Sequence, residues 1–463
     1  MFKRVALLLA LIFILGSLVV VDPASSIKPI QLSPAEQFYS SFGESDDVSA
    51  GGIVQTLDNG YAVIGTLGNG YYPNTALLVK TDSAGKMQWN KTYEFLSKTI
   101  DLLQTGDGGY AILGDGPTLV KTDSIGNIQW KQTYTIPGDY GSAVYSMIQT
   151  SDGGYIIAGR TGEEGDPVTN DGAFYWPHFG YLIKTDWYGN VQWNRTYGEP
   201  RKYNMFNSVV QTSDGGFAAA GTTNFNGSSD IYDLYFWLVR TDGNGTLLWD
   251  GAYGSGPGIN LTGNILNEGR SGDNRANSVV QTADGRFVMA GFTFTYGAGG
   301  SDAWLVKTDS QGRMAWNKTY GYEGDDSANS LILTSEGGLA FAGKVVEGAW
   351  LVKTDEFGAV EWNQTYGGDG YSLTQEPKRL IETSDGGFAI TGDRYFTGSL
   401  TFFYLIKTEP ALPPPPTREF PPVPPPNLLS GLNPALLVLA GATIVAVALV
   451  TVRVLAYQKK RKC

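Results

Sequence analysis

The chain has 463 residues, with 45 acidic and 33 basic side chains, one His and one Cys, and its formal net charge is −12. A single His and a single Cys exclude an intrachain disulfide, a structural zinc site and an iron–sulfur cluster. Aromatic residues make up 13% and charged residues 17% of the chain, which favours a protein with a large core over a disordered one. The acidic balance argues against nucleic acid as a partner.

The N-terminus carries an apolar run from Val5 to Val21 behind Lys3 and Arg4. Small residues follow at 24–26, and this order predicts a secretory signal peptide over residues 1–26. The run is long for a signal peptide and is followed by an Asp-Pro pair. An uncleaved N-terminal anchor is therefore the alternative.

Near the C-terminus, residues 435–452 contain no charged side chain and can span about 30 Å of hydrocarbon. We therefore expect a transmembrane helix over residues 432–457. The basic tail at 458–463 should then lie in the cytoplasm by the positive-inside rule, which places the rest of the chain outside the cell. An exported domain of this size without disulfides points to a prokaryotic, archaeal cell-surface protein.

Residues 409–427 are dense in proline. Such density favours extended polyproline II, which rises about 3.1 Å per residue. We expect this segment to form a stalk that lifts the folded part away from the membrane.

The remaining residues form a repeat. The phrase Ser208–Gly221, with its central Gln-Thr-Ser-Asp-Gly-Gly, recurs and is followed by a phrase like Trp237–Asp242. Each copy contains four strand-like segments separated by Asp- and Gly-rich turns, which is typical of a propeller blade. The sequence therefore predicts an all-β, seven-bladed β-propeller over residues 38–408. Its seven copies are marked by Thr56, Thr105, Thr150, Thr212, Thr282, Thr334 and Thr383.

The last copy ends at the stalk and lacks the fourth strand that the others have. Phe38, Ser41 and Phe42 precede the first copy in the register that Trp316, Thr319 and Tyr320 hold before the sixth. We therefore predict that the N-terminal strand completes the last blade and closes the ring.

The pattern Lys-Thr-Asp-x-x-Gly-x-x-x-Trp, as in residues 80–89 and 307–316, resembles the tryptophan-docking repeats of quinoprotein-like propellers and of prokaryotic surface propellers. The resemblance implies that the repeat tryptophans pack between adjacent blades. Quinone-dependent dehydrogenases of that group need an acidic calcium site and a vicinal disulfide, and one Cys cannot form the latter. We expect no cofactor, no metal and no enzymatic activity. The docking tryptophans are Trp89, Trp130, Trp193, Trp249, Trp316 and Trp362.

Three other sets of polar residues have structural interpretations. An Asp such as Asp123 occupies the same hairpin turn in six repeats, so turn capping is favoured over paired catalytic carboxylates. Glutamines such as Gln104 recur on the first strand and are expected to line the central channel. His178 lies in a long loop, where a general base would need an orienting carboxylate such as Asp171.

Seven N-x-[ST] sequons make the chain a candidate glycoprotein. Four of them directly follow a repeat Trp, on the strand expected to be most exposed. The acceptor asparagines are Asn90, Asn194, Asn226, Asn244, Asn260, Asn317 and Asn363.

Insertions concentrate in the loops between the second and third strands and between successive blades. Both loop types emerge on one face of a propeller, whereas the short turns emerge on the other. We therefore expect a ligand-binding face rich in loop aromatics, suited to sugar stacking or to polar peptide contacts. The candidates are Tyr71, Tyr72, Tyr175, Trp176, Phe225, Tyr232, Tyr296 and Tyr395.

These observations favour a membrane-anchored extracellular β-propeller that acts as a recognition or cell-envelope module with a glycan or envelope-protein partner. An exported enzyme, similar to a glycosidase or to a quinone-dependent dehydrogenase, is one alternative and would require acidic residues that converge on one face. A purely architectural envelope component is the other.

Overall fold

The computed structural model describes residues 35–410 except for 46, 69–73, 137–141, 163–167, 171–172, 176–177, 201, 225–233, 255–271, 347, 367–371 and 397–400. Within this part of the chain, no helix is long and apolar enough to cross a membrane. The predicted signal peptide, the transmembrane helix at 432–457, the basic tail and all but the first two residues of the stalk lie outside the described residues.

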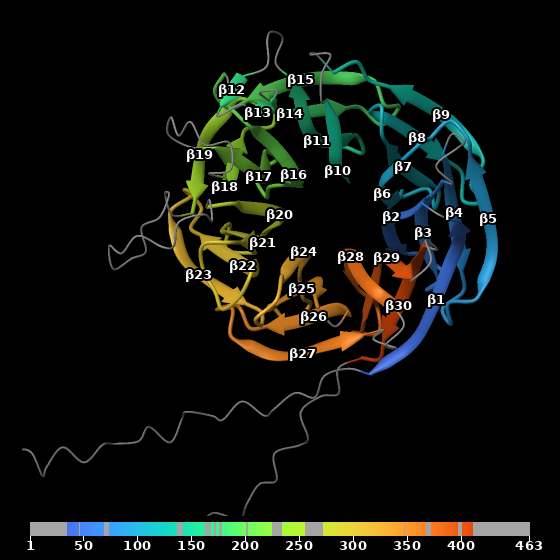
Figure 1. The fold of residues 1–463 in the computed structure, drawn as a ribbon. Helices are drawn as coiled ribbons and strands as arrows, with labels where there is room; N and C mark the ends of the chain where they lie inside the picture. The colour runs from blue at the N-terminus through green and yellow to red at the C-terminus, as the bar shows by residue number, and fades with distance from the viewer. Residues whose placement is uncertain are drawn as a thin grey trace, which may run out of the picture. The chain divides into compact units, whose positions relative to one another are not determined.

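The described residues form seven four-stranded antiparallel sheets arranged in a ring (Figure 1). The prediction of an all-β, seven-bladed propeller is confirmed. The four strands of each blade are called a, b, c and d from the axis to the rim.

The first three blades follow the chain, apart from an added two-stranded hairpin in blade 3. Blade 1 contains β2 (Asp47–Gln55), β3 (Tyr61–Gly68), β4 (Thr75–Thr81) and β5 (Met87–Tyr93). Blade 2 contains β6 (Thr99–Gln104), β7 (Tyr110–Gly114), β8 (Thr118–Thr122) and β9 (Ile128–Thr133). Blade 3 contains β10 (Ala143–Gln149), β11 (Tyr155–Gly162), β14 (His178–Thr185) and β15 (Val191–Tyr197), and its hairpin is β12 (Val168–Asn170) with β13 (Ala173–Tyr175).

The other four blades have the same order, but the last one takes its strand d from the N-terminus. Blade 4 contains β16 (Asn204–Gln211), β17 (Phe217–Asn224), β18 (Leu234–Thr241) and β19 (Leu247–Tyr253). Blade 5 contains β20 (Asn274–Gln281), β21 (Phe287–Thr293), β22 (Asp302–Thr308) and β23 (Met314–Tyr320). Blade 6 contains β24 (Ser327–Leu333), β25 (Leu339–Val345), β26 (Gly348–Thr354) and β27 (Val360–Tyr366), and blade 7 contains β28 (Ser372–Glu382), β29 (Phe388–Phe396), β30 (Thr401–Thr408) and β1 (Glu36–Ser45).

The ring closes where the N-terminal β1 pairs with β30, beside the last strands of the propeller (Figure 1). Phe38 lies opposite Lys407, just as Trp316 lies opposite Lys307 in blade 5. The predicted closure and its register are therefore confirmed. Because the last sheet is completed in this way, its c strand has no open edge.

The core consists of apolar layers between neighbouring blades. In the layer between blades 1 and 2, Ile64 and Leu78 contact Tyr110 and Ile112, and all four are buried. All eight residues of β17 and of β18 are buried, since blades cover both faces of these strands. Two-sided burial explains why the b and c strands form continuous apolar runs rather than alternating ones.

A buried basic residue near the end of strand c is tied to the turn between strands a and b. Lys121 is 1% exposed, and its Nζ lies 2.8 Å from Asp107 Oδ2. The same amine donates to Thr122 O and to Gln129 Oε1, so the buried charge has three partners. Five other blades have the equivalent pair, namely Lys80–Asp58, Lys184–Asp152, Arg240–Asp214, Lys353–Glu336 and Lys407–Asp385.

Candidate ligand-binding site at the inner edge of blades 3 to 7

The innermost strand of every blade contains a β-bulge near its start, shown by a register shift against strand b. A bulge inserts one extra residue and re-aims its side chain, and bulges are frequent beside functional sites. The position is thus repeated around the ring, but the residue that occupies it is not. The bulged residues are Gly51, Ile100, Tyr145, Asn207, Asn277, Asn329 and Lys378.

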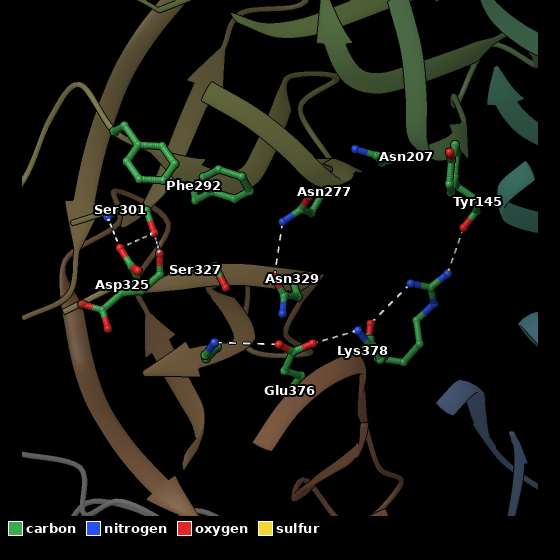
Figure 2. A pocket seen from close by; sticks show the side chains of 14 residues that line it. Tyr145, Asn207, Asn277, Phe292, Ser301, Asp325, Ser327, Asn329, Glu376 and Lys378 are labelled. Atoms are coloured by element: carbon green, nitrogen blue, oxygen red, sulfur yellow. Dashed lines mark hydrogen bonds and ion pairs between the residues drawn. The ribbon is translucent and has the colours of Figure 1, made fainter. Parts of the chain in front are cut away.

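Five of these bulged residues, from blades 3 to 7, line an open pocket of about 520 Å³. Figure 2 shows Tyr145, Asn207, Asn277, Asn329 and Lys378 around it. The rest of the wall comes from blades 5, 6 and 7 and from the loops between them: Phe292, Phe294, Ser301, Asp325, Asp326, Ser327, Lys344, Glu376 and Arg379.

Three consecutive blades contribute an asparagine ladder, formed by Asn207, Asn277 and Asn329. Each side chain donates its Nδ2 hydrogen to a backbone carbonyl of the next blade, at 2.8 Å to Ala276 O, 3.1 Å to Ala328 O and 2.9 Å to Pro377 O. These bonds orient the carboxamides, and Asn277 Nδ2 also donates to Asn329 Oδ1 at 3.3 Å. The Oδ1 atoms of Asn207 and Asn277, which form no hydrogen bond with a described residue, and the second N–H of Asn207 and of Asn329 are left for the pocket wall. An amide offers both a donor and an acceptor, which suits polar ligands that carry both.

The basic side chains of the pocket are all paired with carboxylates. Glu376 lies between Lys378, at 3.2 Å, and Lys344, at 3.8 Å. Arg379 reaches from blade 7 to Asp101 of blade 2, at 3.1 Å, and also donates to the carbonyl of Tyr145 in blade 3. Arg379 therefore connects the inner strand of blade 7 with those of blades 2 and 3, neither of which is next to blade 7 in the ring.

The acidic end of the pocket lies between blades 5 and 6. Asp325 Oδ1 accepts a hydrogen bond from Ser301 N at 2.8 Å, and Asp326 is only 1% exposed. Burial raises the pKa of Asp326, and the nearby Asp302 and Asp325 carboxylates raise it further, against a hydrogen bond from Tyr322 N. The charged form of Asp326 is thus disfavoured in the protein as it stands.

Of the eight predicted aromatic residues, the two whose side chains are described do not line this pocket. Tyr296 packs on Trp304 with ring centroids 5.5 Å apart, and the Tyr395 hydroxyl donates to Asp393 Oδ2 at 3.4 Å. For Tyr175 only the backbone, in β13, is described. The other five candidates lie outside the described residues: Tyr71, Tyr72, Trp176, Phe225 and Tyr232.

The face predicted from the long loops does contribute to the pocket, through Ser301 and Asp325. The bulged residues were not found from the sequence alone. A signal was present, because Asn-Ser opens the apolar part of strand a in three successive repeats, at 207–208, 277–278 and 329–330. Only the bulge explains why these asparagines face the pocket while their neighbours pack in the core.

The repeat tryptophans lie between adjacent blades. Trp89 packs edge-on against Tyr110 of the next blade with centroids 6.1 Å apart, and Trp130 meets Tyr155 in the same way at 6.2 Å. Trp193, Trp249 and Trp362 make equivalent contacts with Phe217, Phe287 and Phe388, whereas Trp316 packs against the core layer of blades 5 and 6.

The glutamines at the end of strand a have a partner that the sequence did not indicate. Gln104 Oε1 accepts a hydrogen bond from Leu57 N in the preceding blade, and Gln55 Oε1 accepts one from Ser384 N across the closure. Instead of simply lining a channel, these side chains join the a–b turns of neighbouring blades.

Asp123 and His178 both have structural environments. Asp123 Oδ1 accepts hydrogen bonds from Ile125 N and Asn127 N, as a turn-capping residue does. His178 is buried against Tyr203, and burial together with the Arg160 charge lowers its pKa to about 4. Its Nδ1 forms no hydrogen bond with a described residue. Asp171 lies outside that part of the chain.

Five of the sequon asparagines are exposed, four on the outermost strands and Asn244 in a c–d turn. The four are Asn90, Asn194, Asn317 and Asn363, whereas Asn226 and Asn260 lie outside the described residues. Among the residues that the structure describes, no three His, Cys, Asp or Glu side chains are grouped so that they could hold a metal ion.

Comparisons with solved structures find only distant similarities. A protein of unknown function from Dyadobacter fermentans is 13% identical, with a TM-score of 0.48 over 81% of this chain and 98% of that one. The Neurospora crassa Pan2 WD40 domain is 12% identical, with a TM-score of 0.47 over 83% and 99%. BamB from Moraxella catarrhalis is 12% identical, with a TM-score of 0.39 over 79% and 99%. No family model and no curated protein sequence matches the chain.

Proposed function

We propose that this protein is a membrane-anchored extracellular recognition module that binds its ligand in the pocket at the inner edge of blades 3 to 7. The observation that carries the proposal is the β-bulge that recurs in the innermost strand of every blade. Seven blades keep the same backbone irregularity, yet five different residue types occupy it. A repeated scaffold with varied side chains at one edge is how repeat proteins build binding surfaces.

The chain enters and leaves the propeller on the side opposite the pocket, which supports a tether on that side. Glu409 N donates to Ala35 O at 2.8 Å, so the chain enters and leaves the described propeller at one point, beside the turns of blade 7. The pocket lies at the other end of the strands, among the loops that contain Ser301 and Asp325. A tether that starts at Glu409 would therefore leave the propeller at the end of the strands opposite the pocket.

The pocket suits binding rather than catalysis. Its basic groups are neutralised by Glu376 and Asp101, and His178, whose pKa is about 4, is not among the lining residues. We infer that the protein acts by holding a glycan or an envelope-protein partner, and that the exposed sequons on the rim carry glycans.

Two experiments test this proposal. A reporter fused after Cys463 should be cytoplasmic, while the propeller of intact cells should be accessible to added protease; an external tail would contradict the anchoring. Full chain in mild detergent should bind a component of glycan or envelope-protein panels, and the pair Asn207→Ala and Asn277→Ala should weaken that binding. Binding that is indifferent to both changes would place the site elsewhere.

A further inference from the structure

In the pocket, the basic side chains are paired with carboxylates, whereas several carboxylates have no basic partner in the part of the chain that the structure describes. Lys344, Lys378 and Arg379 each have a carboxylate within 4 Å. At the other end, the lining residues Asp325 and Asp326, and Asp302 near Asp326 behind the wall, form no ion pair with any described residue. Their recorded partners are backbone N–H groups and the Ser301 hydroxyl. The pocket therefore has surplus negative charge at the junction of blades 5 and 6.

Two of these three carboxylates are buried. Asp302 is 2% exposed, and its oxygens accept hydrogen bonds from Ala298 N and Gly299 N. Asp326 is 1% exposed and lines the pocket, and its Oδ1 has no hydrogen-bond partner among the described residues. Only the other oxygen of Asp326, Oδ2, accepts a hydrogen bond, from Tyr322 N. A buried carboxylate oxygen without a partner is destabilising, because it has lost water and gained no hydrogen bond in return.

Asp325 presents this negative charge to the pocket opening. It is exposed, and only its Oδ1 is bonded to Ser301. Phe292 and Phe294 line the same pocket, with ring centroids 5.9 Å apart and ring planes nearly perpendicular. Carboxylates together with aromatic faces are the side chains that bind ammonium and guanidinium groups.

The asparagine ladder distinguishes among cationic ligands. Asn207, Asn277 and Asn329 present one carboxamide per blade along the wall, each oriented by the next blade. Carboxamides pair with both the N–H and the C=O groups of a peptide backbone, whereas a metal ion or a simple ammonium group can use only their oxygen atoms. No described trio of acidic side chains is arranged to hold a metal.

We infer that the pocket binds an extended segment of a partner protein, with a lysine or arginine side chain directed to Asp325 and Asp326 and its backbone along the asparagine ladder. The inference rests on the proposed function, because it assigns the ligand class of the same site. The cation would neutralise Asp325 and compensate the buried Asp302 and Asp326, with which no described basic group forms an ion pair.

The test uses the full chain in mild detergent and two end-capped pentapeptides, Ac-Ala-Ala-Lys-Ala-Ala-NH2 and its norleucine analogue. Calorimetric titration should show at least about tenfold tighter binding of the lysine peptide, the size expected for one charge-assisted contact. Asp325→Asn and Asp326→Asn should each remove most of that preference. Glu323→Gln is the matched control, because this exposed acid lies in the same loop but does not line the pocket, and it should retain the preference.

The remaining outcomes separate the two proposals. Equal binding of both peptides, or a lysine preference that survives both Asp substitutions, would overturn the inference. If a neutral oligosaccharide such as maltotetraose binds and Asn277→Ala weakens it while the lysine peptide fails to bind, the site stands and its ligand class is wrong. If calcium chloride alone binds and Asp325→Asn removes it, the acidic end is a cation site and the peptide inference fails.

Discussion

The two ends of the inner strands differ in what the repeats have kept. At the turn end, a buried basic residue and an acidic partner recur in six blades, and glutamines join neighbouring a–b turns. At the bulge end, the backbone irregularity recurs but its residue changes from Gly51 to Ile100 to Tyr145 and onward. Interactions that stabilise the individual blades are retained in nearly all of them, while the bulged positions, of which only one sector of the ring lines the pocket, have diverged.

Blade 5 shows what happens when the repeated interaction is lost. Lys307 donates to Glu356 O instead of pairing with the turn carboxylate, and Asp284 pairs with Arg286 at 3.3 Å. The buried amine still has a partner, so the blade keeps its fold. The repeated ion pair therefore contributes stability without being essential to the architecture of a blade.

Removing β1 should have the largest effect on the stability of the propeller. Deletion of residues 36–43 removes strand d of blade 7 and exposes the β30 edge. We expect loss of cooperative unfolding or aggregation, measured by calorimetry and light scattering. A cooperative transition at the wild-type temperature would show that the closure does not hold the ring.

Breaking one repeated ion pair should have the next largest effect. Asp107→Asn leaves the Lys121 charge, which is 1% exposed, without its carboxylate and should lower the free energy of unfolding by about 2 kcal/mol. The matched variant Asp284→Asn breaks only an exposed pair and should change it by less than about 0.5 kcal/mol. Denaturant unfolding compares the two, and equal losses would mean that the buried pairs carry no special weight.

The same ion pairs predict that the folded protein loses stability at low pH. Hydrogen bonds from Lys121, Thr105 and Gly109, together with the lysine charge, outweigh desolvation and lower the pKa of Asp107 to about 2, and Asp58 behaves likewise. Because the folded-state pKa lies below the unfolded value of about 3.9, this stability is present above pH 4 and is lost as the pH falls toward 2. Melting temperatures measured as a function of pH should show this loss, and Asp107→Asn should remove the part that comes from blade 2.

Asp326 should show a smaller effect of opposite sign. Its pKa is raised by burial and by neighbouring carboxylates, so its charge destabilises the folded protein at neutral pH, and this penalty fades as the pH falls. Asp326→Asn should raise the melting temperature slightly at pH 7, and the gain should shrink as the pH falls. A lower melting temperature at pH 7 would show that the carboxylate is needed for folding.

Much of the fold could be predicted from the sequence, because each of the seven repeats contains the same four strands and turns. Seven copies of the Ser-Asp-Gly-Gly type of turn and the register of Phe38 were sufficient to infer blade number and closure. The pocket could not be predicted, because loop length indicates a face but not which strand carries a bulge. Asn207 and its neighbour Ser208 look alike in the sequence, yet the bulge directs only the former to the pocket.

The central claim concerns the two ends of the inner strands. Residues retained at the turn end stabilise the ring, whereas residues that have diverged at the bulge end bind the ligand. The most direct test measures the melting temperature and the affinity for the lysine pentapeptide on the same preparations of wild type, Asp107→Asn and Asp325→Asn. We predict that Asp107→Asn lowers the melting temperature and leaves the affinity unchanged, whereas Asp325→Asn weakens binding at an unchanged melting temperature. If both variants lose both properties together, or if the effects are exchanged, stability and binding are not divided between the two ends.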